Sequence, residues 1–182
     1  MVDTVFAGLL KQAAALDRCV TNVGFEGGVA APSYERYDGE VAARITPAGD
    51  ARYRSILGEQ THVSHQGYLS SDHDVEVGDL LVWKIAETEL SETAEAGATA
   101  IIVAGPTLFE AGQSIEVGTG TTREAALVAA TSGENLTLAG DLAHAHDAGE
   151  KVVPVRQFEV LYVRRWPSVE HHLELALNEV EM

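Results

Sequence analysis

The sequence predicts a mainly β protein with one helix at its N-terminus and a second all-β domain inserted into the first. Short alternating or β-branched runs recur about every ten residues, with glycine turns between them. At 182 residues and 46% hydrophobic composition, the chain is large enough to bury a core. The character of the sequence changes near residue 86 and returns after Pro154. We therefore expect one domain from residues 1–85 plus 155–182, and an inserted β module over 86–154.

The N-terminal segment 3–20 predicts a helix. Asp3 is a plausible N-cap. Apolar residues follow at helical spacing, namely Val5, Leu9, Ala13, Leu16 and Val20. The helix is expected to end at the glycine-rich "TNVGFEGG". Cys19 would lie in this helix as a buried, inert thiol, and a lone cysteine cannot form an internal disulfide.

Strand patterns follow in the rest of the first domain. Residues 39–46 ("GEVAARIT") predict a strand that ends at proline and glycine. Residues 48–59 fit either a short helix or an ordered loop. Residues 61–69 and 80–87 predict two further strands, and "VEVGD" forms the turn that leads into the second.

The stretch "THVSHQGYLSSDHDVEVGD" (61–79) concentrates histidines and carboxylates, which raises the question of a metal site or a catalytic cluster. In a strand, His62 and His65 point to opposite faces, so a shared metal ion is geometrically disfavoured. His73 and the carboxylates fall in a polar connection. We interpret the carboxylates as a solvated loop.

The inserted module is predicted to contain a strand over 99–104 and three more in "LFEAGQSIEVG", "TREAALVAATS" and "ENLTLAG". Similar strand-entry turns are expected at Val77-Gly78-Asp79, Ala111-Gly112-Gln113 and Ala148-Gly149-Glu150. The first domain resumes with a strand over 155–166. Residues 171–182 favour a strand over the competing helix, because Leu173, Leu175 and Leu177 stand on one face and His172, Glu174 and Asn178 largely on the other.

The net charge of the chain argues against nucleic acid as a binding partner. Twelve basic residues stand against 28 acidic ones, and the formal net charge of −16 repels nucleic acid phosphates. The first residues lack the basic start of a signal peptide, and no apolar run approaches the roughly 18 residues that a membrane span needs. We expect a protein made in a cytoplasm, with no membrane partner.

The sequence contains little that indicates an enzyme. His144 and His146 share a face in a strand and, with Asp147, form the best local metal-ligand pattern, but no third ligand is identifiable and a strand at a turn explains it as well. Gly118-x-Gly120 lacks the lysine and the βαβ unit of a phosphate loop and predicts a hairpin turn. We expect no enzyme, no cofactor and no metal site.

The order of "THVSHQGYL", "VEVGDLLVW", "QFEVLYVRR" and "HHLELALNEV" resembles head–tail connector proteins of tailed viruses (bacteriophages or archaeal viruses), in the head closure or stopper family. The resemblance covers about 39–85 and 155–182 and implies a small β-barrel. "AGATAIIVA", "LFEAGQSIEV" and "LTLAGDLAHAHDAGEKV" resemble a β module found in other virion proteins. The N-terminal helix and the long insertion depart from the connector pattern.

This resemblance implies a structural protein of the virion neck. It would form a homo-oligomeric, hexameric ring with adaptor and portal proteins above and the tail tube or tail terminator below. Packaged DNA would pass through the channel without specific binding. The loop over 47–60 corresponds to one that closes the channel in some members. Its channel-facing or ring-contact residues would be Asp50, Arg52, Tyr53 and Arg54.

Two alternatives remain open at this stage. Within the same class, the chain would be an adaptor or a tail-terminator ring protein. In a different class, it would be a carbohydrate- or metal-binding β module on the virion, with 86–154 as the binding unit.

Overall fold

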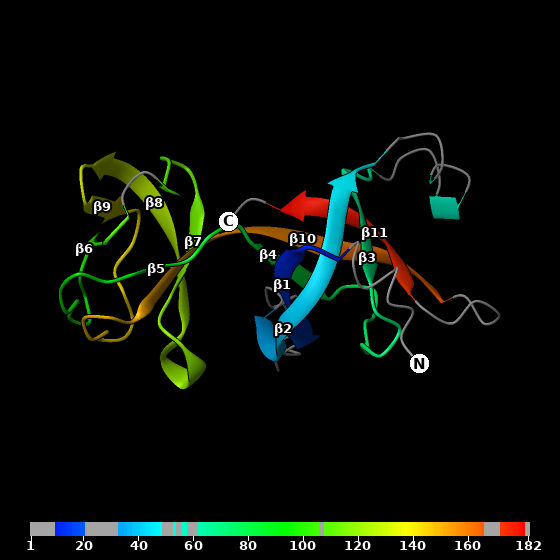
Figure 1. Ribbon diagram of the computed structural model, residues 1–182, viewed down its shortest axis with the longest axis horizontal. Coiled ribbons are helices and arrows are strands. Elements are labelled where there is room, and N and C mark those ends of the chain that lie inside the picture. The colour runs from blue at the N-terminus through cyan, green and yellow to red at the C-terminus, as the bar shows by residue number, and fades with distance from the viewer. Residues whose placement is uncertain are drawn as a thin grey trace, which may run out of the picture. The chain divides into compact units, whose positions relative to one another are not determined.

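The computed structural model describes residues 10–20, 33–48, 53, 56–57, 62–105, 108–165 and 172–180. These residues are mainly in β-strands, joined by antiparallel pairing into one sheet (Figure 1). Within these ranges no helix reaches seven residues, and none has the length and apolar character to cross a bilayer. The predicted β class is therefore confirmed.

The strands follow the chain in two series. The first series is β1 (Gln12–Val20), β2 (Ser33–Pro47), β3 (His65–Leu69) and β4 (Leu80–Lys84). The second is β5 (Thr88–Glu89), β6 (Ala100–Ile102), β7 (Ser114–Val117), β8 (Glu124–Ser132), β9 (Asn135–Leu138), β10 (Lys151–Arg165) and β11 (Leu173–Val180). Hydrogen bonds connect them in the order β11, β3, β2, β1, β4, β10, β7, β8, β9, β6, while β10 also pairs with β5 and with β11.

The chain divides into two compact units. Unit 1 comprises Met1–Trp83 and Gln157–Val180, and unit 2 comprises Lys84–Arg156 with Glu181–Met182. Strand β10 begins in unit 2 and ends in unit 1. Each unit has its own cluster of buried apolar side chains.

The predicted helix over 3–20 is wrong where the structure describes it. Residues 3–9 lie outside the described ranges, but Gln12–Val20 is strand β1, paired antiparallel with β2. Alanine and leucine favour helix, yet this preference is weak against pairing with β2 along the strand and burial of Leu16 in the core. The pairing is irregular on both sides of Leu16, which obscures the period of two in the sequence. Cys19 lies in this strand and is partly exposed.

The core of unit 1 collects one face of each long strand. Its largest members come from β1, β3, β4, β10 and β11, namely Leu16, Leu69, Leu81, Phe158, Leu173, Leu175 and Leu177. The predicted alternation in the last strand is confirmed over Leu173–Val180, because the three leucines enter this cluster. The competing helix is not formed there.

A second, smaller cluster covers the opposite face of β11. Tyr53, Val63 and Ala176 are buried together, with Leu57 and Tyr162 packed against them. Of the segment 48–59, the backbone is helical at residues 53, 56 and 57. Residues 49–52, 54–55 and 58–59 lie outside the described ranges.

The three predicted strand-entry turns share one geometry. Gly78, Gly112 and Gly149 have φ angles of +94°, +84° and +87°. In each turn the residue after the glycine donates its N–H to the carbonyl three residues earlier, as Asp79 does to Glu76 at 3.2 Å. A positive φ at the third position of a turn favours glycine, because other residues meet a steric penalty there. The predicted similarity is confirmed.

Gly67 in β3 tests how closely unit 1 is packed. A Cβ atom added at Gly67 would lie 2.9 Å from Cδ1 of the buried Leu177 and 3.4 Å from Cβ of Leu175. We expect Gly67→Ala to lower the free energy of unfolding by about 1–3 kcal/mol through overpacking. Urea unfolding monitored by circular dichroism measures this loss.

The matched control is Gly39→Ala in β2, where an added Cβ meets nothing within 4 Å. It should change the unfolding free energy by no more than about 1 kcal/mol. Equal losses in the two variants would contradict the packing described for β3 against β11.

Candidate functional site

The predicted ring-contact loop is described at one of its four residues. Asp50, Arg52 and Arg54 lie outside the described residues, and their predicted role stays a prediction. Tyr53 is only 2% exposed. Its hydroxyl donates a hydrogen bond to Glu174 Oε1 at 3.0 Å. Within the single chain, Tyr53 therefore anchors its segment to β11.

Glu174 is a buried carboxylate with several donors around it. It is 3% exposed on the face of β11 opposite the leucines. Besides the Tyr53 hydroxyl, the Gln66 side chain in β3 donates to Glu174 Oε1 at 2.7 Å. Hydrogen bonds of this kind offset the cost of burying a charged group. Tyr53, Gln66 and Glu174 thus tie the segment near residue 53 to two strands.

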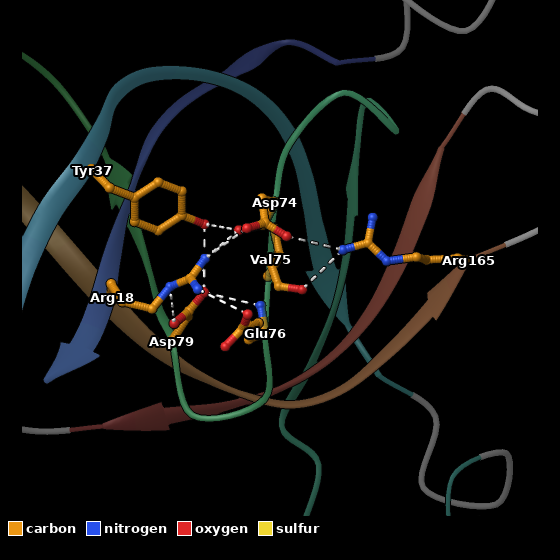
Figure 2. A network of polar contacts seen from close by, with 7 residues as sticks. All are labelled: Arg18, Tyr37, Asp74, Val75, Glu76, Asp79 and Arg165. Carbon is orange, nitrogen blue, oxygen red and sulfur yellow. Dashed lines mark hydrogen bonds and ion pairs between the residues drawn. The ribbon is translucent and has the colours of Figure 1, made fainter. Parts of the chain in front are cut away.

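A second polar cluster holds the connection between β3 and β4 (Figure 2). Its centre is the Arg18 guanidinium, which projects from β1. Arg18 forms ion pairs with Glu76 at 3.0 Å and with Asp79 at 3.1 Å. It also donates to the Asp74 backbone carbonyl at 2.6 Å. One cation therefore binds the connection at three points along its length.

Tyr37 in β2 completes the binding of that connection. Its hydroxyl donates to the Asp74 carbonyl at 2.8 Å (Figure 2), and its ring centroid lies 4.8 Å from the Arg18 guanidinium carbon. Tyr37 has no Cα partner in β1, because the register passes from Arg36 to Asp38 at a bulge-like irregularity. Bulges re-aim side chains, which explains how Tyr37 reaches this cluster.

The local electrostatics keep the Tyr37 hydroxyl protonated. Burial raises the pKa of Tyr37 to about 12, and the negative charges of Asp79 and Asp74 act in the same direction. The hydrogen bond and positive charge of Arg18 oppose this increase without cancelling it. Tyr37 therefore remains a hydrogen-bond donor throughout the neutral range.

Asp79 joins the cluster to the turn before β4. Its side chain is 1% exposed, and Oδ2 accepts the Glu76 backbone N–H at 2.9 Å, which closes the turn. The Gly78 N–H donates to the Val160 carbonyl, and the Val160 N–H donates to the Asp79 carbonyl, each at 2.8 Å. The turn is consequently bound to β10 as well as to β1.

Arg165 reaches the same connection from the far end of β10. It donates to the Val75 carbonyl at 3.3 Å and lies 3.6 Å from Asp74 Oδ1. Its side chain is half-exposed, and that of Asp74 is 78% exposed. Water and salt screen such a pair, so Arg165 contributes less than Arg18 does.

These contacts correct the interpretation of the carboxylates in this stretch as a solvated loop. The correction concerns one of the four carboxylates: Asp72, Asp74 and Glu76 are exposed and fit that interpretation, but Asp79 is buried and ion-paired. Arg18 was missed because residues 3–20 were assigned to a helix, and Tyr37 because the strand that contains it was predicted to begin only at residue 39. The available signal was the scarcity of cations, 12 against 28 acidic residues, which makes a buried arginine partner valuable to any buried carboxylate.

The histidines of this stretch occupy separate environments. His62 is exposed, whereas the His65 ring packs edge-on against Phe158 with 4.8 Å between ring centroids. His73 contacts Asp38 in β2 at 3.0 Å. The structure does not bring these rings together, and the described residues contain no group of three or more His, Cys, Asp or Glu arranged to hold a metal ion.

The remaining sequence candidates lie in unit 2. His144 is exposed, while His146 is buried and contacts Glu124 and Glu150 instead of Asp147. Gly118 and Gly120 have φ angles of +80° and +60° at the end of β7, as turn glycines do. The predicted hairpin turn is confirmed, because β7 and β8 pair antiparallel on either side of it.

The cluster around Arg18 holds one connection of the chain in place. We call it the Arg18 clasp, and it comprises Arg18, Tyr37, Asp74, Val75, Glu76, Asp79 and Arg165. Its charged groups are ion-paired, although Arg18 Nε contacts Asp79 without forming a hydrogen bond, and the cation neutralises carboxylates that would otherwise repel. The arrangement fixes a long connection on three strands, β1, β2 and β10. A search of protein-family models and of curated proteins gives no match for this sequence.

The clasp predicts unequal effects for its two arginines. Arg18→Met leaves the buried Asp79 carboxylate without its cation, and we expect it to lower the free energy of unfolding by about 2–3 kcal/mol. Arg165→Met, the matched control, removes a half-exposed arginine and should cost less than about 1 kcal/mol. Chemical denaturation of both variants measures the difference, and a larger loss in Arg165→Met would refute the central role of Arg18.

Tyr37 predicts a loss of stability in strong alkali. Its folded pKa of about 12 lies above the ordinary value of 10.0, so the unfolded chain releases this proton first. The free energy of unfolding should therefore fall as pH rises from about 10 to 12. Tyr37→Phe should lack this component, and the difference in unfolding midpoint between the two proteins across that range measures it. A constant difference would show that Tyr37 ionises normally.

Proposed function

We propose that this chain is a structural protein of the head–tail connector, or neck, of a tailed virus. It forms a homo-oligomeric ring below the portal and adaptor, helps retain packaged DNA, and offers the docking surface for the tail. The observation that carries this proposal is the cyclic order of strand pairing in unit 1, combined with the motif order "THVSHQGYL", "VEVGDLLVW", "QFEVLYVRR" and "HHLELALNEV".

The pairing supports a small barrel. It runs from β10 to β11, β3, β2, β1 and β4 and then back to β10. A sheet whose pairing returns to its first strand leaves no free edge for strand addition. Contacts with neighbouring subunits would then use loops and outward-facing side chains, which suits a ring with a defined number of subunits.

The place of the insertion also supports a connector protein that carries an additional module. Unit 2 begins at Lys84, directly at the end of β4, and ends within β10. The resemblance implies a tight hairpin at this point. A module grafted onto a hairpin tip extends a barrel without altering the order of its strands. We place this module on the outside of the ring, because about 70 residues would crowd a narrow axis.

The loop over 47–60 has two roles in this proposal. Tyr53 holds it on β11 through Glu174. Asp50, Arg52 and Arg54 would face the channel or a neighbouring subunit. A loop anchored at one buried residue can present flanking side chains at a defined position. The anchor is what the described contacts add to the prediction from sequence.

The charge suits both the channel and the assembly. At −16 per subunit, the protein repels phosphate, which allows DNA to pass without tight binding. The same charge opposes association between subunits at low ionic strength. Salt of about 1 M reduces the screening length to roughly 3 Å and should favour the ring.

A cryo-electron microscopy map of the neck of particles that contain this chain tests the proposal. The expected result is a symmetric ring between the portal–adaptor complex and the tail tube, with density for both units and with Arg52 and Arg54 at the axis or a subunit boundary. A position directly on the portal or at the end of the tail would assign the chain to an adaptor or a tail terminator. A position on the capsid surface or tail fibres, or absence from the particle, would refute the neck assignment.

A further inference from the structure

A buried histidine joins three parts of unit 2. The His146 side chain is 0% exposed and lies between two carboxylates. Its Nε2 atom is 2.9 Å from Glu124 Oε1, and its Nδ1 atom is 2.9 Å from Glu150 Oε2. Glu124 is the first residue of β8, and Glu150 directly precedes β10. His146 therefore links the connection 139–150 to β8, and contacts the last residue of that connection, which directly precedes β10.

The backbone around this ring holds it in one place. The Ala143 and His144 N–H groups donate to the Glu124 carboxylate at 2.6 and 2.9 Å. Gly118 lies against the imidazole, where an added Cβ would be 2.6 Å from both Cε1 and Nδ1. The His146 backbone also exchanges two hydrogen bonds of 2.8 Å with Ala94. The ring thus has no room to turn away from either carboxylate.

This geometry requires a particular protonation state. A neutral imidazole has one donor nitrogen and one acceptor nitrogen, whereas an imidazolium has two donors. A carboxylate faces each nitrogen, so a neutral ring would place a nitrogen lone pair against a carboxylate oxygen. The imidazolium satisfies both contacts and reduces the repulsion between Glu124 and Glu150. Of the charged groups in the described part of the chain, these two are the ones that contact the ring.

We propose that His146 is a proton-dependent clamp: it is an imidazolium in the folded protein at neutral pH, and loss of its proton in alkaline solution removes one of its two carboxylate contacts and weakens the attachment of the connection 139–150 to β8. The clamp operates in the direction opposite to that of most buried histidines, which gain charge and destabilise a fold in acid. It is independent of the neck assignment, since it rests on contacts within unit 2.

The pKa directions agree with the geometry. Burial alone would lower the pKa of His146, but the hydrogen bonds and charges of Glu150 and Glu124 outweigh it and raise the pKa above 6.5. The stability that His146 contributes is therefore complete below its unfolded pKa and is lost as pH rises through the higher folded pKa.

The pKa values of Glu124 and Glu150 set the lowest pH at which the clamp is complete. Burial tends to raise the pKa of Glu124, but hydrogen bonds from Ala143, His146 and His144 lower it below 4.5. The pKa of Glu150 is lowered first by its hydrogen bond with His146. Their contribution is present above about 4.5 and is lost as pH falls through the lower folded values. The clamp is complete between these limits.

Nitrogen-15 NMR of the full chain tests the protonation state directly. At pH 7 the two His146 ring nitrogens should both carry a proton, and both should couple to the ring hydrogens as in an imidazolium. The His144→Gln variant identifies the signals of His144, the other histidine of the segment, because those signals disappear. It should leave the His146 signals unchanged. A neutral tautomer of His146 at pH 7 would overturn the proposal, whatever the stability of any variant.

Stability as a function of pH tests the clamp itself. Between pH 6 and pH 10, the folding equilibrium constant of the original protein should fall relative to that of His146→Gln, by about tenfold for each pH unit that separates the folded and unfolded pKa values. Glu150→Gln replaces the carboxylate with a neutral side chain of similar size and should move the His146 transition to lower pH. His144→Gln should retain the original profile. Parallel pH profiles for the original protein and His146→Gln would overturn the clamp.

The backbone amides report which segment is loosened. In the original protein, the Ala143 and His144 amides should lose protection from hydrogen exchange as His146 deprotonates, relative to Leu136 in β9 at the same pH. Comparison at one pH cancels the hydroxide catalysis that accelerates exchange at every amide as pH rises. Retained protection at Ala143 and His144 after His146 has lost its proton would show that the segment stays attached to β8.

Discussion

Strand β10 is the constraint on which both units depend. Its first residues pair with β5 and β7, and its later residues pair with β11. Fifteen residues of one strand thus supply backbone partners to two separate cores. Buried backbone groups that lack partners are costly, so neither unit could keep its ladder of hydrogen bonds if β10 adopted another conformation. Pro154 is accommodated inside this strand although it has no N–H to donate.

The distribution of arginine follows from the excess of acid. Three of the buried carboxylates in the described residues have an arginine partner: Asp17 with Arg36, Asp79 with Arg18, and Glu116 with Arg123. A fourth, Glu174, accepts hydrogen bonds from Tyr53 and Gln66. A chain with so few cations places them where an unpaired charge would be most harmful, while its exposed carboxylates serve solubility. His146 has a comparable role, because the imidazolium supplies positive charge between Glu124 and Glu150, as an arginine does beside the first three carboxylates.

Much of the β class was predictable, because alternation and glycine turns report directly on strands. The last strand shows this best: Leu173, Leu175 and Leu177 face the core as their spacing indicates. Strand β1 was not predictable by the same means. Its alanines favour helix, and its partner β2 lies beyond a long intervening segment, so no local pattern records the pairing. The contacts of Arg18 were therefore not predicted either, because residues 3–20 were assigned to a helix and Arg18 was not expected in a sheet.

The candidate site divides in a similar way. His62 and His65 were correctly separated by alternation, a local rule. Tyr53 could not be placed from sequence, because its partner Glu174 lies 121 residues away. The His146 contacts combine residues from β8, from the turn after β7 and from the segment before β10. Spacing within "LAHAHDAG" suggested a histidine pair, whereas the fold pairs one of those histidines with distant carboxylates.

The hydrogen bond between the Ile85 N–H and the Pro154 carbonyl, at 2.9 Å, has an evolutionary consequence. The chain enters and leaves unit 2 at the same place, so this unit could be gained, lost or exchanged as a whole by recombination at two neighbouring points. A short turn between those points would restore a plain hairpin and leave the order of the other strands intact. Changes within unit 2 would therefore leave the pairing of the strands outside it unaltered.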